Sequence, residues 1–245
     1  CYLVGKSMIP THNSNLALGL AFNLHQRSLI ARRNYGDLAR LIDDAVEIRG
    51  SKVGLNQSPP PKFRIAEGKT IDFFAANRVG DERARMGQGV DLFVADESTH
   101  FAESQIKFLM GWVRSEDPNQ RCRTVLPTNP PLTAEGLWVI QMFAPWLNPQ
   151  FPHPAKPGEL RWVITDADGN DQWVTGPGEY PTEVAGVIKM VEAKSRSYIP
   201  SSVQDNPYYA ESGYQKELDA MPEPYRSLLM GGFKTAFQDQ PNQII

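Results

Sequence analysis

The stretch Val90-Asp91-Leu92-Phe93-Val94-Ala95-Asp96-Glu97 combines a continuous apolar run with two acids at its end. A short run of large apolar side chains is typical of a β-strand that is buried on both faces, and such strands belong to parallel sheets covered by helices. Ligands of open parallel sheets bind beyond the carboxyl ends of the strands. The stretch therefore predicts an α/β fold and places Asp96 and Glu97 where a site would lie.

Segments on either side of this strand alternate between helical and strand patterns. Apolar residues recur at helical spacing in residues 16–24 and 38–46, and Gly50 is placed to end the second helix. Helices that alternate with buried strands favour a mainly parallel sheet flanked by helices. Further patterns predict strands at residues 28–31 and 121–129, helices at 103–113 and 132–146, and hairpins joining 63–65 with 70–75 and 160–164 with 172–174.

The composition excludes several classes of protein. With 245 residues, 41% of them hydrophobic, and a net charge of −3, the chain can bury a core and has no basic footprint for nucleic acid as a whole. Only Cys1 and Cys122 are present, without a zinc spacing, which favours a reducing compartment. No apolar run approaches the roughly 18 residues of a membrane span. We therefore expect a soluble intracellular protein without a membrane partner.

Asp96 and Glu97 suit nucleotide hydrolysis. An aspartate can hold the shell of a Mg²⁺ ion, while the neighbouring glutamate accepts a proton from the attacking water. The alternative is that both acids are solvated turn residues, or that they cap a helix beginning near Ser98.

The next strand ends in Thr128 and Asn129. At the same sheet edge, a hydroxyl and an amide could contact a γ-phosphate or the attacking water. The alternative is a turn in which Asn129 and the two following prolines only fix the backbone.

Near the start of the chain, Gly5-Lys6-Ser7 is similar to the end of a phosphate-binding loop. No glycine stands five residues before Gly5, and Pro10 would disrupt the helix that Ser7 should begin. We therefore expect that Gly5-Lys6-Ser7 is not a working phosphate-binding loop.

Six blocks resemble, in the same order, the large terminase subunit of tailed bacteriophages, the ATPase that drives DNA into capsids. They are residues 27–43, 91–112, 121–140, 152–162, 195–214 and 218–233. The resemblance implies a P-loop NTPase-type α/β fold with a small hairpin insertion and a lid or linker, and ATP and Mg²⁺ as cofactors. It implies that Asp96, in the Walker B motif, coordinates Mg²⁺, and that Glu97 is the catalytic base. Thr128 and Asn129 would couple the state of the γ-phosphate to movement, and Ser14 would supply the Mg²⁺-binding hydroxyl.

The resemblance also implies partners. They are double-stranded DNA, the capsid portal, the terminase small subunit and further copies in a homo-oligomeric ring, all in the host bacterial cytoplasm. Family members often carry an arginine before the acidic strand that reaches a neighbour's site, and Arg83 or Arg85 are the candidates here. The chain ends about where the nuclease half of the family begins.

The start of the chain, residues 1–13, looks like the C-terminal end of an intein. Asn13 could cyclise and cut the following peptide bond, His12 could assist as acid or base, and Ser14 could be the nucleophile that receives the upstream segment. The phosphate-loop lysine would then lie upstream, and this chain alone would hydrolyse little ATP. The alternative is that residues 1–13 are a shuffled end without activity.

These interpretations divide the chain into an intein remnant at 1–13, a terminase ATPase core at 14–194 and a lid or linker at 195–245. Arg196 or Asp205-Asn206 would bridge the linker to the sheet. Two other functions stay open: a protein-splicing substrate, or an inert prophage fragment.

Overall fold

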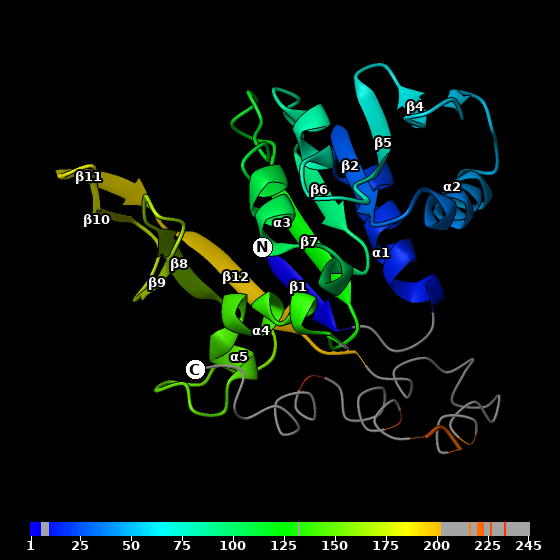
Figure 1. Cartoon of the computed structure of the whole chain (residues 1–245). Helices are drawn as coiled ribbons and strands as arrows, with labels where there is room; N and C mark the ends of the chain where they lie inside the picture. Colours follow the sequence, from blue (N-terminus) through cyan, green and yellow to red (C-terminus); the bar gives the residue numbers. More distant parts are fainter. Residues whose placement is uncertain are drawn as a thin grey trace.

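A mixed ten-stranded sheet forms the centre of the molecule (Figure 1). The computed structural model describes residues 1–5, 10–131, 133–201, 216, 220–222, 226 and 233. In spatial order the strands are β3 (Leu55–Asn56), β4 (Lys62–Ala66), β5 (Lys69–Ala75), β2 (Arg27–Arg32), β6 (Leu92–Ala95), β7 (Arg123–Thr128), β1 (Tyr2–Gly5), β12 (Lys194–Ile199), β8 (Arg161–Thr165) and β9 (Asp171–Val174). The strands from β5 to β12 run parallel, and antiparallel strands extend the sheet at both edges.

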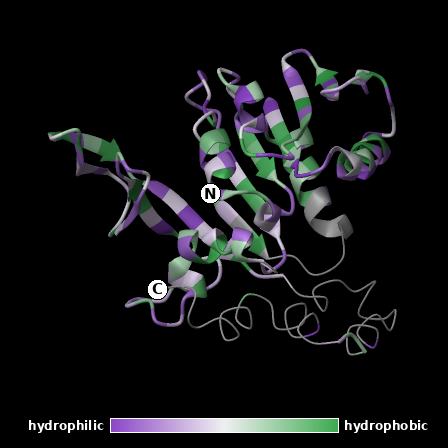
Figure 2. Ribbon diagram, in the orientation of Figure 1, coloured by the Kyte–Doolittle hydropathy of each residue, from purple (hydrophilic) through white to green (hydrophobic). Residues whose placement is uncertain are grey.

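Helices cover both faces of the sheet and bury two apolar layers. One layer lies under α1 (Pro10–Asn23) and α2 (Tyr35–Arg49), and the other under α3 (Glu103–Met110), α4 (Trp138–Met142) and α5 (Ala144–Leu147). Neighbouring strand residues alternate between the layers, so Leu29 and Phe93 pack in the second layer while Ile30 and Val94 pack in the first. Figure 2 shows the hydrophobic residues concentrated along these strands. The predicted α/β fold is confirmed.

The predicted local elements are largely confirmed. The apolar run Leu92–Ala95 forms β6, and both predicted hairpins form, as β4–β5 and as β8–β9. Helix α2 ends at Gly50, whose φ of 70° is left-handed and whose N–H donates to the carbonyls of Val46 and Glu47. In the described part of the chain, no helix has both the length and the apolar character to cross a membrane.

One helix prediction was wrong in its continuity. In place of the one helix predicted over residues 132–146, residues 134–147 form a 3₁₀ turn, η3 (Ala134–Gly136), followed by the two short helices α4 and α5. Pro145 has no backbone N–H to continue α4, and it lies in the first turn of α5 instead.

The last three strands of the described chain were not predicted from the sequence. Strands β10 (Glu179–Val184) and β11 (Val187–Glu192) form a separate hairpin, and β12 pairs with β1 and β8 inside the main sheet. The expected end of the ATPase core at residue 194 therefore falls at the start of β12. Asp205 and Asn206 lie outside the described residues.

Candidate functional site

The carboxyl ends of the central parallel strands meet at one edge of the sheet. Ala31 of β2 is in register with Ala95 of β6, and Gly5 of β1 is in register with Thr128 of β7. The backbone N–H of Asp96 donates to the carbonyl of Ala31 over 2.9 Å. The predicted pairs Asp96-Glu97 and Thr128-Asn129 therefore follow strands of the same sheet edge, where β1 also ends before the chain continues to α1.

Asp96 is buried, with 1% of its surface exposed, and forms an ion pair with Arg32 at the end of β2. The Nε of Arg32 donates to Oδ2 of Asp96 over 2.8 Å, and Nη2 of the same guanidinium donates to the same oxygen. A buried carboxylate needs such a partner, because an uncompensated charge in the interior costs several kcal/mol. Arg32 therefore holds the Asp96 side chain in place at the sheet edge.

Glu97 adopts an unusual backbone conformation directly after Asp96. Its φ is 57° and its ψ is 52°, the left-handed region that residues other than glycine seldom occupy. The following 3₁₀ turn is η2 (Ser98–His100), and the Glu97 side chain makes no capping hydrogen bond to it. The interpretation of Glu97 as a helix cap is therefore not supported. Strained residues of this kind cluster at functional sites.

The hydroxyl of Thr128 is completely engaged by the protein. It donates to the carbonyl of Asn129 over 3.0 Å and accepts from the N–H of Thr99 over 3.2 Å. The hydroxyl of Thr99 lies 2.8 Å away, and it is the donor of this bond because the Thr128 proton is already used. A hydroxyl has one donor and two acceptor positions, so Thr128 has none left for a phosphate. Thr128 therefore positions the end of β7 rather than contacting a ligand in this arrangement.

Two other polar atoms at this edge have unused hydrogen-bonding capacity. Asn129 Oδ1 and Ser98 Oγ are both buried and have no hydrogen-bond partner among the described residues. Buried polar atoms are normally paired, so each such atom needs an explanation, and a ligand is one. Ser98 was not singled out from the sequence, although its place directly after two acids was a usable signal.

The described residues at this edge fit a Mg²⁺-nucleotide, and Asp96 is the buried acid that would hold the ion. The described residues contain no group of three metal-ligating side chains. Mg²⁺ usually takes one or two carboxylates and completes its shell with waters and substrate phosphates, so a dense protein cage is not required. Asn129 and Ser98 offer the additional oxygens.

The predicted residues at the chain start lie in α1. This helix begins at Pro10, so His12 and Asn13 lie in its first turn and Ser14 begins its second. Proline suits the first helical position because it needs no hydrogen-bond partner for an N–H there. The side chains of His12, Asn13 and Ser14, and residues 6–9, lie outside the described part of the chain.

The three arginines named from the sequence have different surroundings. Arg85 is buried, pairs with Asp72 over 2.7 Å and lies over the ring of Phe74. Arg83 is exposed in η1 (Asp81–Arg85). Arg196 is buried in β12, where it donates to the Met142 carbonyl and pairs with Asp171.

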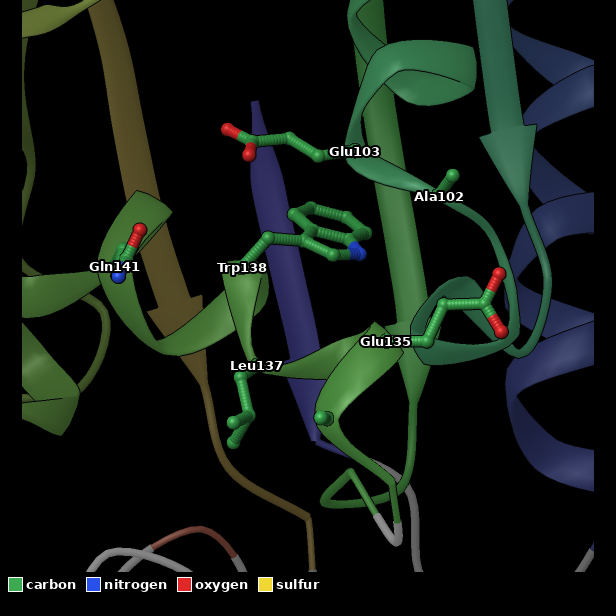
Figure 3. Close-up of a pocket in the computed structure, with 7 residues that line it drawn as sticks. Ala102, Glu103, Glu135, Leu137, Trp138 and Gln141 are labelled. Carbon is green, nitrogen blue, oxygen red and sulfur yellow. The ribbon is translucent and has the colours of Figure 1, made fainter. Parts of the chain in front are cut away.

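An open pocket lies beside the acidic edge, between α3 and the segment η3–α4 (Figure 3). The ring of Trp138 lies between Glu103 and Glu135 in this view, and its Nε1 donates to the carbonyl of Phe101. Glu135 also pairs with Arg33, the residue after Arg32, over 3.4 Å. The pocket wall is therefore linked to the end of β2.

The comparisons with known proteins agree with this architecture. The large terminase of a thermophilic bacteriophage, solved in complex with ADP, superposes with a TM-score of 0.56 at 11% sequence identity, over 95% of this chain and 48% of that one. The chain shares the fold of a large terminase. It spans about half of that protein's length.

A second solved structure is more distant. The ATPase domain of the large terminase from Thermus phage P74-26 aligns at 11% identity over 94% of this chain and 86% of that one, with a TM-score of 0.44. No protein-family model and no curated protein sequence matches the chain.

Proposed function

We propose that this chain is the ATPase half of a DNA-packaging motor of the large-terminase type, in which Mg-ATP hydrolysis moves double-stranded DNA into a capsid. The observation that carries the proposal is the position of Asp96 and Glu97. They follow a buried parallel strand at the edge of a sheet whose fold is shared with a large terminase solved with ADP. Two orphaned polar atoms, on Ser98 and Asn129, lie in the segments that leave the same edge.

Each residue has a role in this proposal. Asp96 would hold Mg²⁺, and Arg32 would then share or release the carboxylate. Bound Mg²⁺ would offset charge on the β- and γ-phosphates. Glu97 would accept a proton from the attacking water, a contribution of about 10² to 10⁴ in rate. Asn129, more than Thr128, would sense the γ-phosphate, since the Thr128 hydroxyl is already engaged.

The proposed partners follow from the same function. We expect double-stranded DNA to be held through phosphate contacts that weaken as salt increases. The capsid portal, a terminase small subunit and a homo-oligomeric ring complete the proposal, in the cytoplasm of a bacterial host.

The test uses the sequence before Ser14, which offers no lysine at the position that a phosphate loop requires. The unmodified chain should show negligible ATPase activity. The triple variant S7G/H12G/N13K creates a Gly-x-x-x-x-Gly-Lys-Ser motif ending at Ser14, and it should bind Mg-ATP and gain turnover. Adding Glu97→Gln should remove the turnover and keep the binding, while Glu67→Gln, in an exposed turn, should change neither.

Two results would contradict the proposal. If the triple variant folds but does not bind Mg-ATP, the inert-fragment alternative is favoured. If it hydrolyses ATP and Glu97→Gln leaves the rate unchanged, Glu97 is not the base.

Protein splicing is a second proposal, and it rests on the sequence of residues 1–14, in which a short apolar stretch is followed by His12, Asn13 and Ser14. The comparisons give it no support. It predicts that a mixture with an upstream partner segment yields a ligated product of higher mass, and that Asn13→Ala prevents ligation.

A further inference from the structure

One face of the β10–β11 hairpin consists of exposed residues and mixes apolar with acidic side chains. Directly paired residues of an antiparallel hairpin share a face. We define the acidic hairpin face by three such pairs: Glu179 with Glu192, Pro181 with Met190, and Glu183 with Ile188. All six residues are exposed, including 73% of Ile188 and 57% of Met190.

This face is suited to a protein partner with basic and apolar side chains. A two-stranded hairpin is marginally stable on its own in water, and β10–β11 forms a sheet separate from the main one. Burying Ile188 and Met190 against a partner would remove their apolar surface from water, which favours association. Three carboxylates around them would repel the phosphates of DNA and attract cationic side chains.

The same chain displays the complementary surface at the other edge of the sheet. We define the basic edge patch as Ile48, Arg49, Lys52, Val53 and Arg64, which are all exposed, Val53 by 77% and Ile48 by 48%. Residues 47–69 contain five basic residues and two acids, Glu47 and Glu67. The patch combines two apolar with three cationic side chains, and the acidic hairpin face combines three apolar with three acidic ones.

Hydrogen bonds hold the basic edge patch together. The N–H of Arg64 donates to the carbonyl of Gly54 over 2.9 Å, which places the turn containing Lys52 and Val53 beside Arg64. Arg49 donates from Nη2 to the carbonyl of Ile65 over 2.9 Å, so the end of α2 lies beside β4. The patch is therefore one surface made of α2, the turn before β3, and β4.

The two surfaces lie at opposite ends of the molecule. The basic edge patch borders β3 and β4 at one edge of the sheet, while β8 and β9 form the other edge, from which the hairpin follows in the chain. Figure 1 shows β10 and β11 on the far side from α2 and β4, and Figure 2 shows hydrophobic colouring along β11.

We propose that the acidic hairpin face of one copy docks on the basic edge patch of a second copy, head to tail. Two different surfaces in contact make a heterologous interface, which produces a closed ring where the rotation closes and a filament where it does not. This interface would be the contact between neighbouring copies in the ring expected under the proposed function. Only the closure of the ring rests on that function. The contact itself uses none of the residues of the nucleotide site.

Charge reversal tests the interface in the 245-residue chain without nucleotide or DNA. Sedimentation velocity of the unmodified chain at about 10 to 100 µM should show self-association in about 50 mM NaCl that weakens in about 500 mM NaCl, because salt screens exposed charges. Variant E179K/E183K/E192K and variant R49E/K52E/R64E should each associate at least about tenfold more weakly, a loss of roughly 1.4 kcal/mol.

Mixing the two variants is the decisive step. Each then presents a surface complementary to the other, so the mixture should associate although neither variant does so alone. Variant E116K/D117K/D168K, which reverses three exposed acids outside both surfaces, should associate like the unmodified chain. Circular dichroism of every variant confirms that it is folded.

The proposal is wrong if the unmodified chain stays monomeric at low salt, if either reversed variant associates normally, or if the mixture of folded variants stays monomeric. Loss of double-stranded DNA binding without loss of association in R49E/K52E/R64E would instead identify the patch as a nucleic-acid contact. Failure of the ATPase test with self-association intact would contradict only the proposed function.

Discussion

The hydroxyls of Thr99 and Thr128 lie 2.8 Å apart, and both residues are buried. This bond joins the turn after Glu97 to the end of β7. A Cβ atom added at Gly136 would lie 2.8 Å from the Thr99 carbonyl oxygen, so η3 packs directly on the same turn. A continuous set of contacts therefore runs from β7 through Thr99 to the pocket beside the site.

Replacing Thr99 with valine should destabilise the protein. Valine keeps the shape of the side chain but removes the Thr99 hydroxyl that donates to Thr128. One acceptor position of the buried Thr128 hydroxyl is then left without a donor, at a cost of about 1–3 kcal/mol. Urea denaturation measures the change in the free energy of unfolding. Thr70→Val on β5 is the control and should cost less than about 0.5 kcal/mol, because the Thr70 hydroxyl makes no hydrogen bond to the described residues. Equal costs for both variants would contradict the assigned role of the Thr99 hydroxyl.

Replacing Gly136 with alanine should also be costly. The added methyl group would meet the Thr99 carbonyl oxygen at 2.8 Å and Pro131 Cβ at 2.9 Å, so η3 or η2 must shift. We expect a loss of about 1–3 kcal/mol by thermal or urea unfolding. Gly19→Ala in α1 is the matched control. Nothing lies within 4 Å of its added Cβ, and the change should stabilise the helix by about 0.5–1 kcal/mol. A neutral Gly136→Ala would show that η3 does not pack tightly.

The central strands could be predicted from sequence because burial on both faces leaves a simple pattern. Residues 92–95 are all buried and all apolar, and the acids that follow mark where the strand ends. The site acids are therefore visible in sequence as a change from apolar to charged residues.

The roles within the site could not be predicted in the same way. Thr128 is a plausible phosphate contact until its partner is known, and Thr99 is 29 residues away in the chain. Arg32 and Asp96 are 64 residues apart. The β10–β11 hairpin has little buried surface, so its mixture of glutamates and apolar residues does not show the pattern of a strand that packs against a core.

The ion pair of Arg32 and Asp96 should contribute more to the free energy of unfolding than a surface ion pair does. Arg32→Met leaves a buried carboxylate with less compensation, and we expect a loss of about 3 kcal/mol or more by urea denaturation. A double-mutant cycle with Asp96→Asn should give a coupling energy of about 1–3 kcal/mol. The Glu159–Arg161 pair, 2.9 Å apart and 40% and 30% exposed, is the control, with a coupling of about 0–1 kcal/mol. If both cycles gave the same small value, Arg32 would not be what holds Asp96.

At the amino end of β6, Asp91 should make the free energy of unfolding depend on pH in the acidic range. His25 Nε2 accepts from Arg123 over 2.9 Å, because arginine only donates, so His25 Nδ1 carries the proton and donates to Asp91 over 3.2 Å. Burial raises the pKa of Asp91, but this hydrogen bond and those from the N–H groups of Gln26 and Arg27 outweigh it, and the pKa lies below its usual 3.8.

The sign of the effect follows from the lowered pKa. Between the folded and unfolded values the unfolded chain binds more protons, so the stabilisation from Asp91 is complete above about pH 4 and is lost as pH falls through the folded pKa. Asp91→Asn should therefore be less stable than the unmodified chain at about pH 6, and the difference in the free energy of unfolding should shrink as the pH falls below about 4. Urea denaturation across this range measures it, with the exposed Asp117→Asn as control. A difference of the same size at about pH 3 and pH 6 would mean that the Asp91 carboxylate is not stabilised in the folded state, whatever its contacts with His25, because only a charge-dependent interaction disappears on protonation.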